Sequence, residues 1–396
     1  MTSKERKDIS IYIHIPFCVR KCFYCDFNSQ VPPSEDTVFY YTAALIEEIK
    51  ASAELLHDRE LKSIYIGGGT PSSIPSSCIS RVIETVSSVI DIDDDTEITI
   101  EANPGTLTDL KIKDYVSSGI NRISMGLQSA VEEELRVLGR IHSFDDLKKN
   151  FDRLYWGGID NINVDVMTSI PYQTRESLIE TLDAVTGLKP QHISAYSLII
   201  EQNTPFYDKY RYGLLPLPGE DESYYIYKLT QEYLASKGYR RYEISNYSLD
   251  DGDPEDKRHR DFRCLHNLRC WDRRDYLGYG VSAASLMGDH RFTNTADLNQ
   301  YASDPGGIKQ EDIILRPEDA MAEFMFLGLR KTDGIRCADF EESFDMDIDK
   351  VFGWVMKHHS DKGLAAFSGE GEDRRFFLTD KGLDISNIVM SEYLLY

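Results

Sequence analysis

Apolar and polar positions follow a repeating strand–helix pattern in the first half of the chain. Short runs with a two-residue period predict six strands, at residues 11–15, 63–66, 96–101, 121–125, 160–166 and 192–199. Longer runs with apolar residues every three or four positions predict helices between them, at 38–56, 76–90 and 143–158. Strands separated by helices pair in parallel through right-handed crossovers. Six units are too few to close an eight-stranded barrel, so we expect an α/β fold with a partial (β/α)6 TIM-like barrel.

Residues 316–396 form a second pattern. Their spacing predicts helices at 316–331, 337–344 and 349–362, a hairpin that turns at Gly369 and Gly371, and a final helix from Asp380. The connecting segment predicts a helix at 219–238, a strand at 242–248 and a charged loop at 250–261. We therefore expect a core domain over 1–238, an extension over 239–310 and a smaller winged-helix-like α+β domain over 311–396.

Charge and hydropathy narrow the range of partners. The net charge of −23 argues against a nucleic-acid ligand, because phosphate binding needs a basic surface. Residues 316–396 hold 17 Asp and Glu against 10 Lys and Arg, which makes a DNA-binding winged helix a poor fit. No stretch approaches the roughly 20 apolar residues of a membrane span, and the polar start of the chain lacks a signal-peptide core. We expect a soluble cytoplasmic protein with reduced thiols.

Three cysteines follow the first strand on one loop. Pro16 ends the strand, and Cys18, Cys22 and Cys25 then come with the spacing C-x3-C-x2-C. Thiols so close together indicate one shared metal ion or iron–sulfur cluster. Phe27 stands where a fourth close ligand could be, so three protein ligands would leave one position open for a substrate or cofactor.

Two other interpretations of these cysteines remain. A zinc site would recruit His14 or Asp26 as its fourth ligand. A disulfide fits less well, because the total of seven cysteines is odd and no secretion signal is present.

The string around the cysteines, Y-x-H-I-P-F-C-x3-C-x-Y-C-D-F-N, resembles the radical S-adenosylmethionine (SAM) signature. Its wider form is similar to that of the oxygen-independent coproporphyrinogen III oxidases (dehydrogenases) and their relatives, the haem chaperones. The resemblance covers nearly the whole chain and implies that Cys18, Cys22 and Cys25 hold a [4Fe–4S] cluster whose open iron chelates SAM. An electron from a donor such as flavodoxin or ferredoxin would then split SAM to a 5′-deoxyadenosyl radical.

The resemblance also implies SAM-binding residues. The run Gly67–Thr70 resembles the family's GGGTP motif, and Glu101 at the end of the third strand resembles its SAM-binding glutamate. The implied contacts of a first SAM are Tyr12, Gly68 and Glu101; those of a second SAM are Tyr24, Gly69, Thr70, Gln128, Arg140 and Asp165. Taken alone, the glycines are equally a tight turn, Glu101 a capping or solvent carboxylate and Arg140 a surface residue. Whether a second SAM binds stays open.

His266 lies in H-N-L-R-C-W, which resembles the H-N-x-x-Y-W motif proposed to bind haem in the haem-chaperone branch. Cys270 replaces the usual tyrosine. Cys264, His266 and Cys270 are also a plausible soft-metal cluster, although a lone histidine is more often packed or at the surface. The string G-V-S-A-A-S at 280–285 departs from the G-A-H of many chaperones and is closer to the dehydrogenase branch.

Two functions compete. One is a haem chaperone that passes haem to an acceptor protein; the other is coproporphyrinogen III dehydrogenase, which removes two propionate carboxyls. The dehydrogenase branch has a fourth cysteine where this chain has Phe27, and a long N-terminal segment where only eleven residues precede Tyr12. We therefore expect a haem-binding chaperone without oxidase activity.

Overall fold

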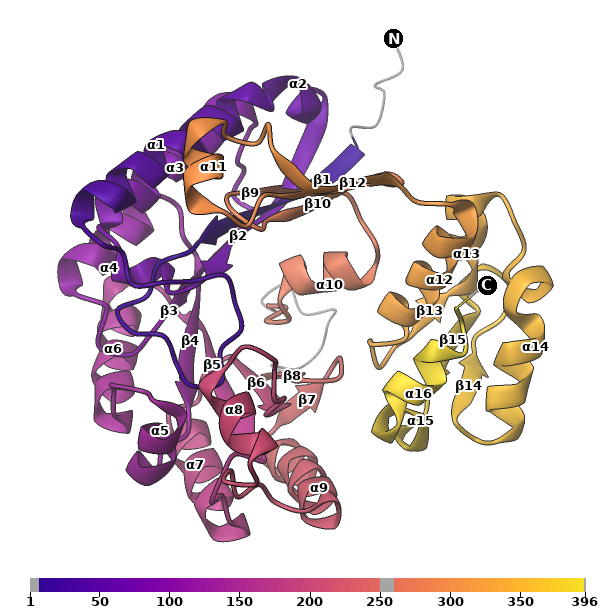
Figure 1. Cartoon of the computed structure of the whole chain (residues 1–396). Coiled ribbons are helices and arrows are strands. Elements are labelled where there is room, and N and C mark those ends of the chain that lie inside the picture. Colours follow the sequence, from indigo (N-terminus) through magenta and orange to yellow (C-terminus); the bar gives the residue numbers. More distant parts are fainter. Residues whose placement is uncertain (1–6, 250–259, 395–396) are drawn as a thin grey trace.

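A computed structural model describes residues 7–249 and 260–394, so most of the predicted charged loop at 250–261 lies outside the described residues. Six parallel strands form a curved sheet at its centre (Figure 1). They are β1 (Lys7–Ile15), β2 (Arg59–Gly68), β3 (Glu97–Ala102), β4 (Arg122–Gln128), β5 (Asn161–Thr168) and β6 (His192–Ser197). They neighbour one another in chain order, and the sheet does not close. The predicted partial barrel is confirmed.

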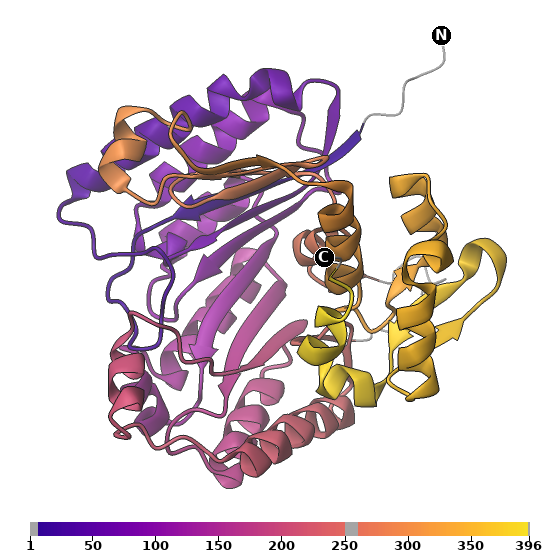
Figure 2. The ribbon, with the colours of Figure 1, turned by 45° about the vertical axis from the view of Figure 1, so that its right-hand side comes forward.

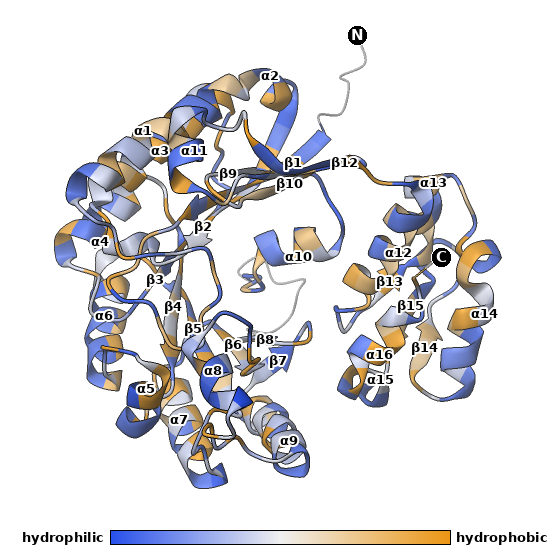
Figure 3. Ribbon diagram, in the orientation of Figure 1, coloured by the Kyte–Doolittle hydropathy of each residue, from blue (hydrophilic) through white to orange (hydrophobic). Residues whose placement is uncertain are grey.

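Helices cover the outer face of this sheet (Figures 1 and 2). They are α1 (Glu35–Ala51), α2 (Ala53–Leu56), α3 (Ser76–Val89), α4 (Asp109–Ser117), α5 (Glu132–Leu138), α6 (Phe144–Gly157), α7 (Arg175–Gly187) and α9 (Glu220–Ser236). The short η1 (Pro71–Ser73) follows β2, and α8 (Pro205–Arg211) packs through Phe206 on Phe23 and Tyr24 of the cysteine loop. In α6 a capping box at Ser143 satisfies the free N–H groups of the first turn, while Leu147 and Leu154 face the sheet. Figure 3 shows the resulting mixture of hydrophilic and hydrophobic residues on these helices.

Further strands extend the sheet at both edges; all of them pair antiparallel except β9, which pairs parallel with β1. Beyond β6 lie β8 (Asn246–Leu249) and β7 (Tyr239–Arg241); beyond β1 lie β9 (Tyr276–Tyr279), β10 (Ala284–Met287), β11 (His290–Asn294) and β12 (Lys309–Ile314). The single strand predicted at 242–248 is wrong, because the Glu243 carboxylate accepts a hydrogen bond from the Ser245 N–H (2.7 Å) and the chain turns there. Two short helices, α10 (Leu265–Trp271) and α11 (Leu298–Ser303), belong to the same region.

The C-terminal part has a core of its own. Its helices are α12 (Pro317–Gly328), α13 (Cys337–Phe344), α14 (Ile348–Asp361), α15 (Asp380–Asp384) and α16 (Ser386–Ser391). Its small sheet contains β13 (Ile335–Arg336), β14 (Ala365–Ser368) and β15 (Arg375–Leu378), with η2 (Gly371–Asp373) in the β14–β15 turn. Phe340, Phe352, Phe376 and Tyr393 pack at its centre. The predicted helix–hairpin–helix layout of a small α+β domain is confirmed.

Candidate functional site

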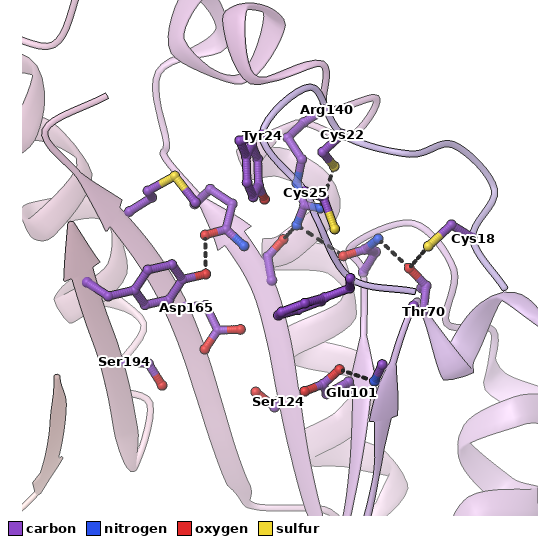
Figure 4. Close-up of a pocket in the computed structure, with 18 of the residues that line it drawn as sticks. Cys18, Cys22, Tyr24, Cys25, Thr70, Glu101, Ser124, Arg140, Asp165 and Ser194 are labelled. Carbon is purple, nitrogen blue, oxygen red and sulfur yellow. Dashed lines mark hydrogen bonds between the residues drawn. The ribbon is translucent and has the colours of Figure 1, made fainter. Parts of the chain in front are cut away.

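The cysteine loop lies at the C-terminal end of β1 and is fastened on two sides. The Cys18 N–H donates to the Gln30 carbonyl (3.0 Å), which closes the loop on itself. The Thr70 N–H donates to the Phe17 carbonyl (2.7 Å), which ties the loop to the turn after β2. Cys18, Cys22 and Cys25 line one cavity of about 470 Å³ (Figure 4). A cavity of this volume at the ends of parallel strands suits a small-molecule ligand.

Two of the thiols have hydrogen-bond donors beside them. The Arg140 Nη1 donates to Cys22 Sγ (3.2 Å), and the Thr70 hydroxyl donates to Cys18 Sγ (3.5 Å), as the dashed lines in Figure 4 mark. Such donors would stabilise the negative charge of thiolates that ligate a cluster. Burial raises the pKa of the Cys25 thiol in the absence of a metal.

The cysteines are not arranged around a single ion. Among residues 7–249 and 260–394, no three His, Cys, Asp or Glu side chains converge closely enough to ligate one metal ion. An iron–sulfur cluster does not need this convergence, because each thiolate binds a different iron. The donor set of three thiols on one loop, two of them with hydrogen-bond donors, therefore fits a cluster better than a zinc ion.

Gly68 and Gly69 allow the turn after β2 to pack against the cysteine loop. A Cβ built on Gly69 would lie 2.7 Å from the Phe17 carbonyl oxygen. Gly68 has a φ of +110°, and a Cβ there would lie 2.6 Å from the His14 ring. Close contacts within the protein therefore require glycine at both positions. A side chain at position 68 would clash with His14 rather than with a ligand in the cavity.

Glu101 ends β3 inside the same cavity. Its carboxylate accepts hydrogen bonds from the Tyr65 hydroxyl (2.9 Å) and the Gly68 N–H (3.2 Å). Burial raises the pKa of Glu101 to about 7, against the lowering effect of the Tyr65 hydrogen bond. Near neutral pH this carboxylate therefore exists in both protonation states, and a cationic or hydrogen-bond-donating ligand would favour the ionised one.

Arg140 joins the cysteine loop to the ends of the neighbouring strands. Besides Cys22, it donates to the Asn103 side chain (3.0 Å) and to the Gly126 carbonyl. A second predicted residue, Gln128, lies nearby at a φ of +77° and accepts a hydrogen bond from the Tyr196 hydroxyl (2.9 Å).

Tyr24 and Asp165 also line the cavity. Asp165 accepts a hydrogen bond from the Asn163 amide (2.7 Å), and burial raises the pKa of its carboxyl. Figure 4 shows both residues directed into the cavity, together with Arg140.

Tyr12 and His266 do not line this cavity. The Tyr12 hydroxyl bonds to His14 Nδ1 (2.9 Å), and its ring lies beside that of Tyr65. His266 belongs to α10, at the opposite ends of the strands from the cysteine loop. Its Nδ1 bonds to the Ser63 hydroxyl (2.9 Å), its ring lies 5.2 Å from the Tyr65 ring, and its exposed fraction is 5%. Burial lowers the pKa of His266 to about 3, so the ring is neutral.

Glu97 fixes α10 in this position. Its carboxylate accepts hydrogen bonds from the Leu265 N–H (3.0 Å) and the His266 N–H (3.1 Å) at the start of the helix. Burial also raises the pKa values of Cys264 and Cys270 to about 12, so both thiols are protonated. In this conformation Cys264, His266 and Cys270 do not form a group of metal ligands.

Known proteins resemble the chain over its full length. The Radical SAM superfamily model matches residues 12–185, and the HemN C-terminal domain model matches residues 315–385. Heme chaperone HemW of Lactococcus lactis is 34% identical, with 98% of both chains covered. That of Bacillus subtilis is 32% identical, over 97% of this chain and 99% of its own. The chain belongs to the HemW family of radical SAM proteins.

A solved structure agrees with this membership in fold. The radical SAM enzyme coproporphyrinogen III oxidase (HemN) from Escherichia coli superposes with a TM-score of 0.83 at 24% identity, covering 100% of this chain and 92% of its own. Membership in the radical SAM group implies a [4Fe–4S] cluster and SAM as cofactors. None of the helices within the described residues is long and apolar enough to span a bilayer.

Two features of this HemW-family chain were not expected from its sequence. Tyr65 bonds to Glu101, and Asn103 bonds to Thr70 and Arg140. The local sequence does not identify either as a site residue, although Asn103 comes two residues after Glu101. The G-V-S-A-A-S segment supports the cysteine loop, because the Asn28 amide donates to the Ser282 hydroxyl (2.8 Å). This string therefore has a structural role next to the cysteine loop.

Proposed function

We propose that this protein is a haem chaperone that binds haem and transfers it to an acceptor protein. The observation that carries the proposal is the end-to-end match to relatives named heme chaperone HemW. Phe27 supports it, because this exposed residue (60%) stands where a fourth cysteine would be needed for the oxidase pattern. The fold alone does not separate the two functions, since the oxidase HemN shares it.

In this proposal Cys18, Cys22 and Cys25 ligate the [4Fe–4S] cluster. The cluster, when reduced by a donor such as flavodoxin or ferredoxin, supplies the electron that cleaves SAM. Glu101 orients the first SAM together with Gly68, and Tyr12 acts through its position beside Tyr65.

A second SAM would contact other residues of the same cavity. The proposed residues are Tyr24, Gly69, Thr70, Gln128, Arg140 and Asp165. Their convergence on one cavity supports this assignment, because residues far apart in the sequence meet there.

Haem ligation by His266 requires a rearrangement. The histidine ring is covered by α10 and the strands, so the helix must separate from Glu97 and Ser63 before an iron can reach it. Release of α10 would expose Cys270 at the same time, and its thiol is a second candidate axial ligand. We therefore propose that haem binds to an opened form of this segment.

We also propose three functional parts: a radical SAM core over 1–238, an extension with the H-N-L-R-C-W segment over 239–310 and a HemN-type domain over 311–396. The extension completes the sheet of the core at both edges, whereas the last part has a separate hydrophobic core. A cytoplasmic location is supported by the seven cysteines, all of which are unpaired.

Haem titration of the purified full chain, combined with an oxidase assay, tests the proposal. We expect about one haem per chain with a defined Soret band, and no conversion of coproporphyrinogen III to protoporphyrinogen IX by cluster-replete protein with SAM and reductant. The triple substitution of Cys264, His266 and Cys270 by Ala should change the Soret band. Robust oxidase turnover without haem binding would replace the chaperone function with the dehydrogenase function.

A further inference from the structure

The cavity is lined by a buried arginine that forms no ion pair within the described residues. Arg122, the first residue of β4, is only 2% exposed and lines the cavity below the cysteine loop. Its Nε has no hydrogen-bond partner, and the described part of the chain provides no ion pair or side-chain hydrogen bond for the guanidinium. A buried charged donor without acceptors is costly, so protein interiors normally pair it.

The nearest carboxylate does not fill this role. Glu97 lies close enough to influence Arg122 electrostatically, but it forms no ion pair with it. Its oxygens already accept the N–H groups of Leu265 and His266 at the start of α10. Within the described residues the guanidinium is therefore left with hydrogen-bonding capacity that a molecule in the cavity could use.

Two side-chain amides at the same cavity share this property. Asn246 of β8 is 7% exposed, and Asn267 lies on α10. Both line the cavity, and within the described residues neither amide is hydrogen-bonded to the protein. Arg122, Asn246 and Asn267 come from three separate elements and offer donors to the same cavity.

The acidic groups of the cavity lie nearer to the cysteine loop. Strand register pairs Arg122 with Thr99, and places Glu101 two residues and Asp165 four residues further toward the C-terminal ends of the strands. At ~3.3 Å per residue these steps are about 7 and 13 Å. These acidic groups are therefore displaced along the strands from Arg122, and the cations Arg20, Lys21 and Arg140 line the cavity as well. A ligand carboxylate would be attracted to Arg122 itself.

We propose that the part of the cavity lined by Arg122 is a binding site for a carboxylate group, with Arg122 as its main ligand and Asn246 and Asn267 as additional donors. Arginine suits this role because its planar fork binds both carboxylate oxygens at once. The site does not depend on haem binding, and no haem is needed to test it. The carboxylate belongs either to SAM itself or to a separate small organic acid.

Binding of propionate to the full-length, cluster-replete protein tests the site. Saturation-transfer NMR at constant ionic strength should detect propionate, and propionamide should give no signal, because it lacks the charge. Arg122→Met should weaken propionate binding by about tenfold or more. Arg20→Gln is the matched control: it removes a charge from the opening of the same cavity and should leave affinity within about twofold.

The stability of the same variants separates a ligand role from a structural one. Without propionate, Arg122→Met should melt at the same temperature as the wild type or higher, because it removes an unpaired buried charge. Arg122→Lys keeps the charge but loses the fork, and should also bind propionate more weakly. If SAM displaces propionate and Arg122→Met weakens SAM binding, the carboxylate is that of SAM; if both bind together, it belongs to another acid. Absent propionate binding in the wild type, or undiminished binding in Arg122→Met, would overturn the site.

Discussion

The cysteine loop and the α10 segment look alike in sequence but differ in the structure. Each places sulfur ligands within a few residues, and α10 adds a histidine. Cys22 and Cys25 of the loop are partly exposed in a cavity, and Arg140 lies beside one of them. In α10, His266 is buried and bonded to Ser63, and the whole helix is fixed by Glu97. Spacing alone therefore identifies groups that can bind metal, while exposure and neighbouring charge decide which of them are ready to do so.

The difference has a physical cause. A thiolate or a neutral imidazole binds iron only if the site offers room and favours the reactive protonation state. The cysteine loop offers room in the cavity, and Arg140 and Thr70 donate hydrogen bonds to two of its sulfurs. The cysteines of the α10 segment meet neither the condition of room nor that of protonation state, because burial keeps Cys264 and Cys270 protonated, with pKa values of about 12. The loop is preorganised for its cofactor, whereas the proposed haem ligation by His266 would require α10 to open.

The largest expected effect is on the cluster. Replacing Cys18, Cys22 or Cys25 by Ser should abolish the [4Fe–4S] cluster, because a hydroxyl is a poor iron ligand. Cys264→Ser, the matched change in α10, should leave it intact. Iron and sulfide analysis with absorption spectra after anaerobic reconstitution measures both. Equal loss of iron in Cys264→Ser would erase the distinction between the two segments.

The second effect concerns the support of the loop. Gly68→Val should lower SAM cleavage by at least about tenfold, because a side chain at this φ is strained and meets the His14 ring. Gly105→Val is the control, since Gly105 has a φ of +85° with no atom within 4 Å of its Cβ position. The production of 5′-deoxyadenosine measures the effect. A Gly68→Val protein as active as the control would show that the glycine is not needed for packing.

The third effect concerns the attachment of α10 to Glu97. Glu97→Gln removes the charge that holds the start of α10 and should lower the free energy of unfolding by about 1–3 kcal/mol. The same change should strengthen haem binding through His266, because it favours the opened helix. Urea unfolding and haem titration measure the two, with Glu133→Gln on the surface as the neutral control. Weaker haem binding in Glu97→Gln would contradict an opening of α10.

The smallest effect is a pH dependence of SAM binding. Because burial raises the pKa of Glu101 to about 7, the carboxylate is ionised above that pH and protonated below it. SAM affinity should therefore rise about tenfold between pH 6 and pH 8, and the profile of Glu101→Gln should be flat. Calorimetric titration across this range measures it. A wild-type profile as flat as that of the variant would remove Glu101 from the SAM site.

The elements that periodicity predicted are those with long apolar patterns. The six parallel strands and helices such as 349–362 follow their sequence because each buries one continuous face. The four strands over 276–314 were missed, since runs of four to six residues give too little period. For the same reason α10, with seven residues, was not recognised as a helix.

The residues of the candidate site were also predicted only in part. Eleven of the thirteen predicted residues line one cavity, because their motifs end strands that meet at one edge of the sheet. The environment of His266 could not be predicted, since it depends on Ser63 and Glu97 from distant strands. Arg122 was missed for a similar reason: nothing in its local sequence shows that it lacks a partner.

Tyr65 stands between the two segments. Its hydroxyl donates to Glu101 on the cavity side, and its ring faces His266 on the α10 side. One side chain therefore contacts both proposed ligand regions. Thermodynamic reciprocity then applies: if occupancy at Glu101 changes the affinity at His266 by some factor, occupancy at His266 changes the affinity at Glu101 by the same factor. With favourable coupling of this kind, haem would bind at His266 mainly when SAM is already bound near Glu101.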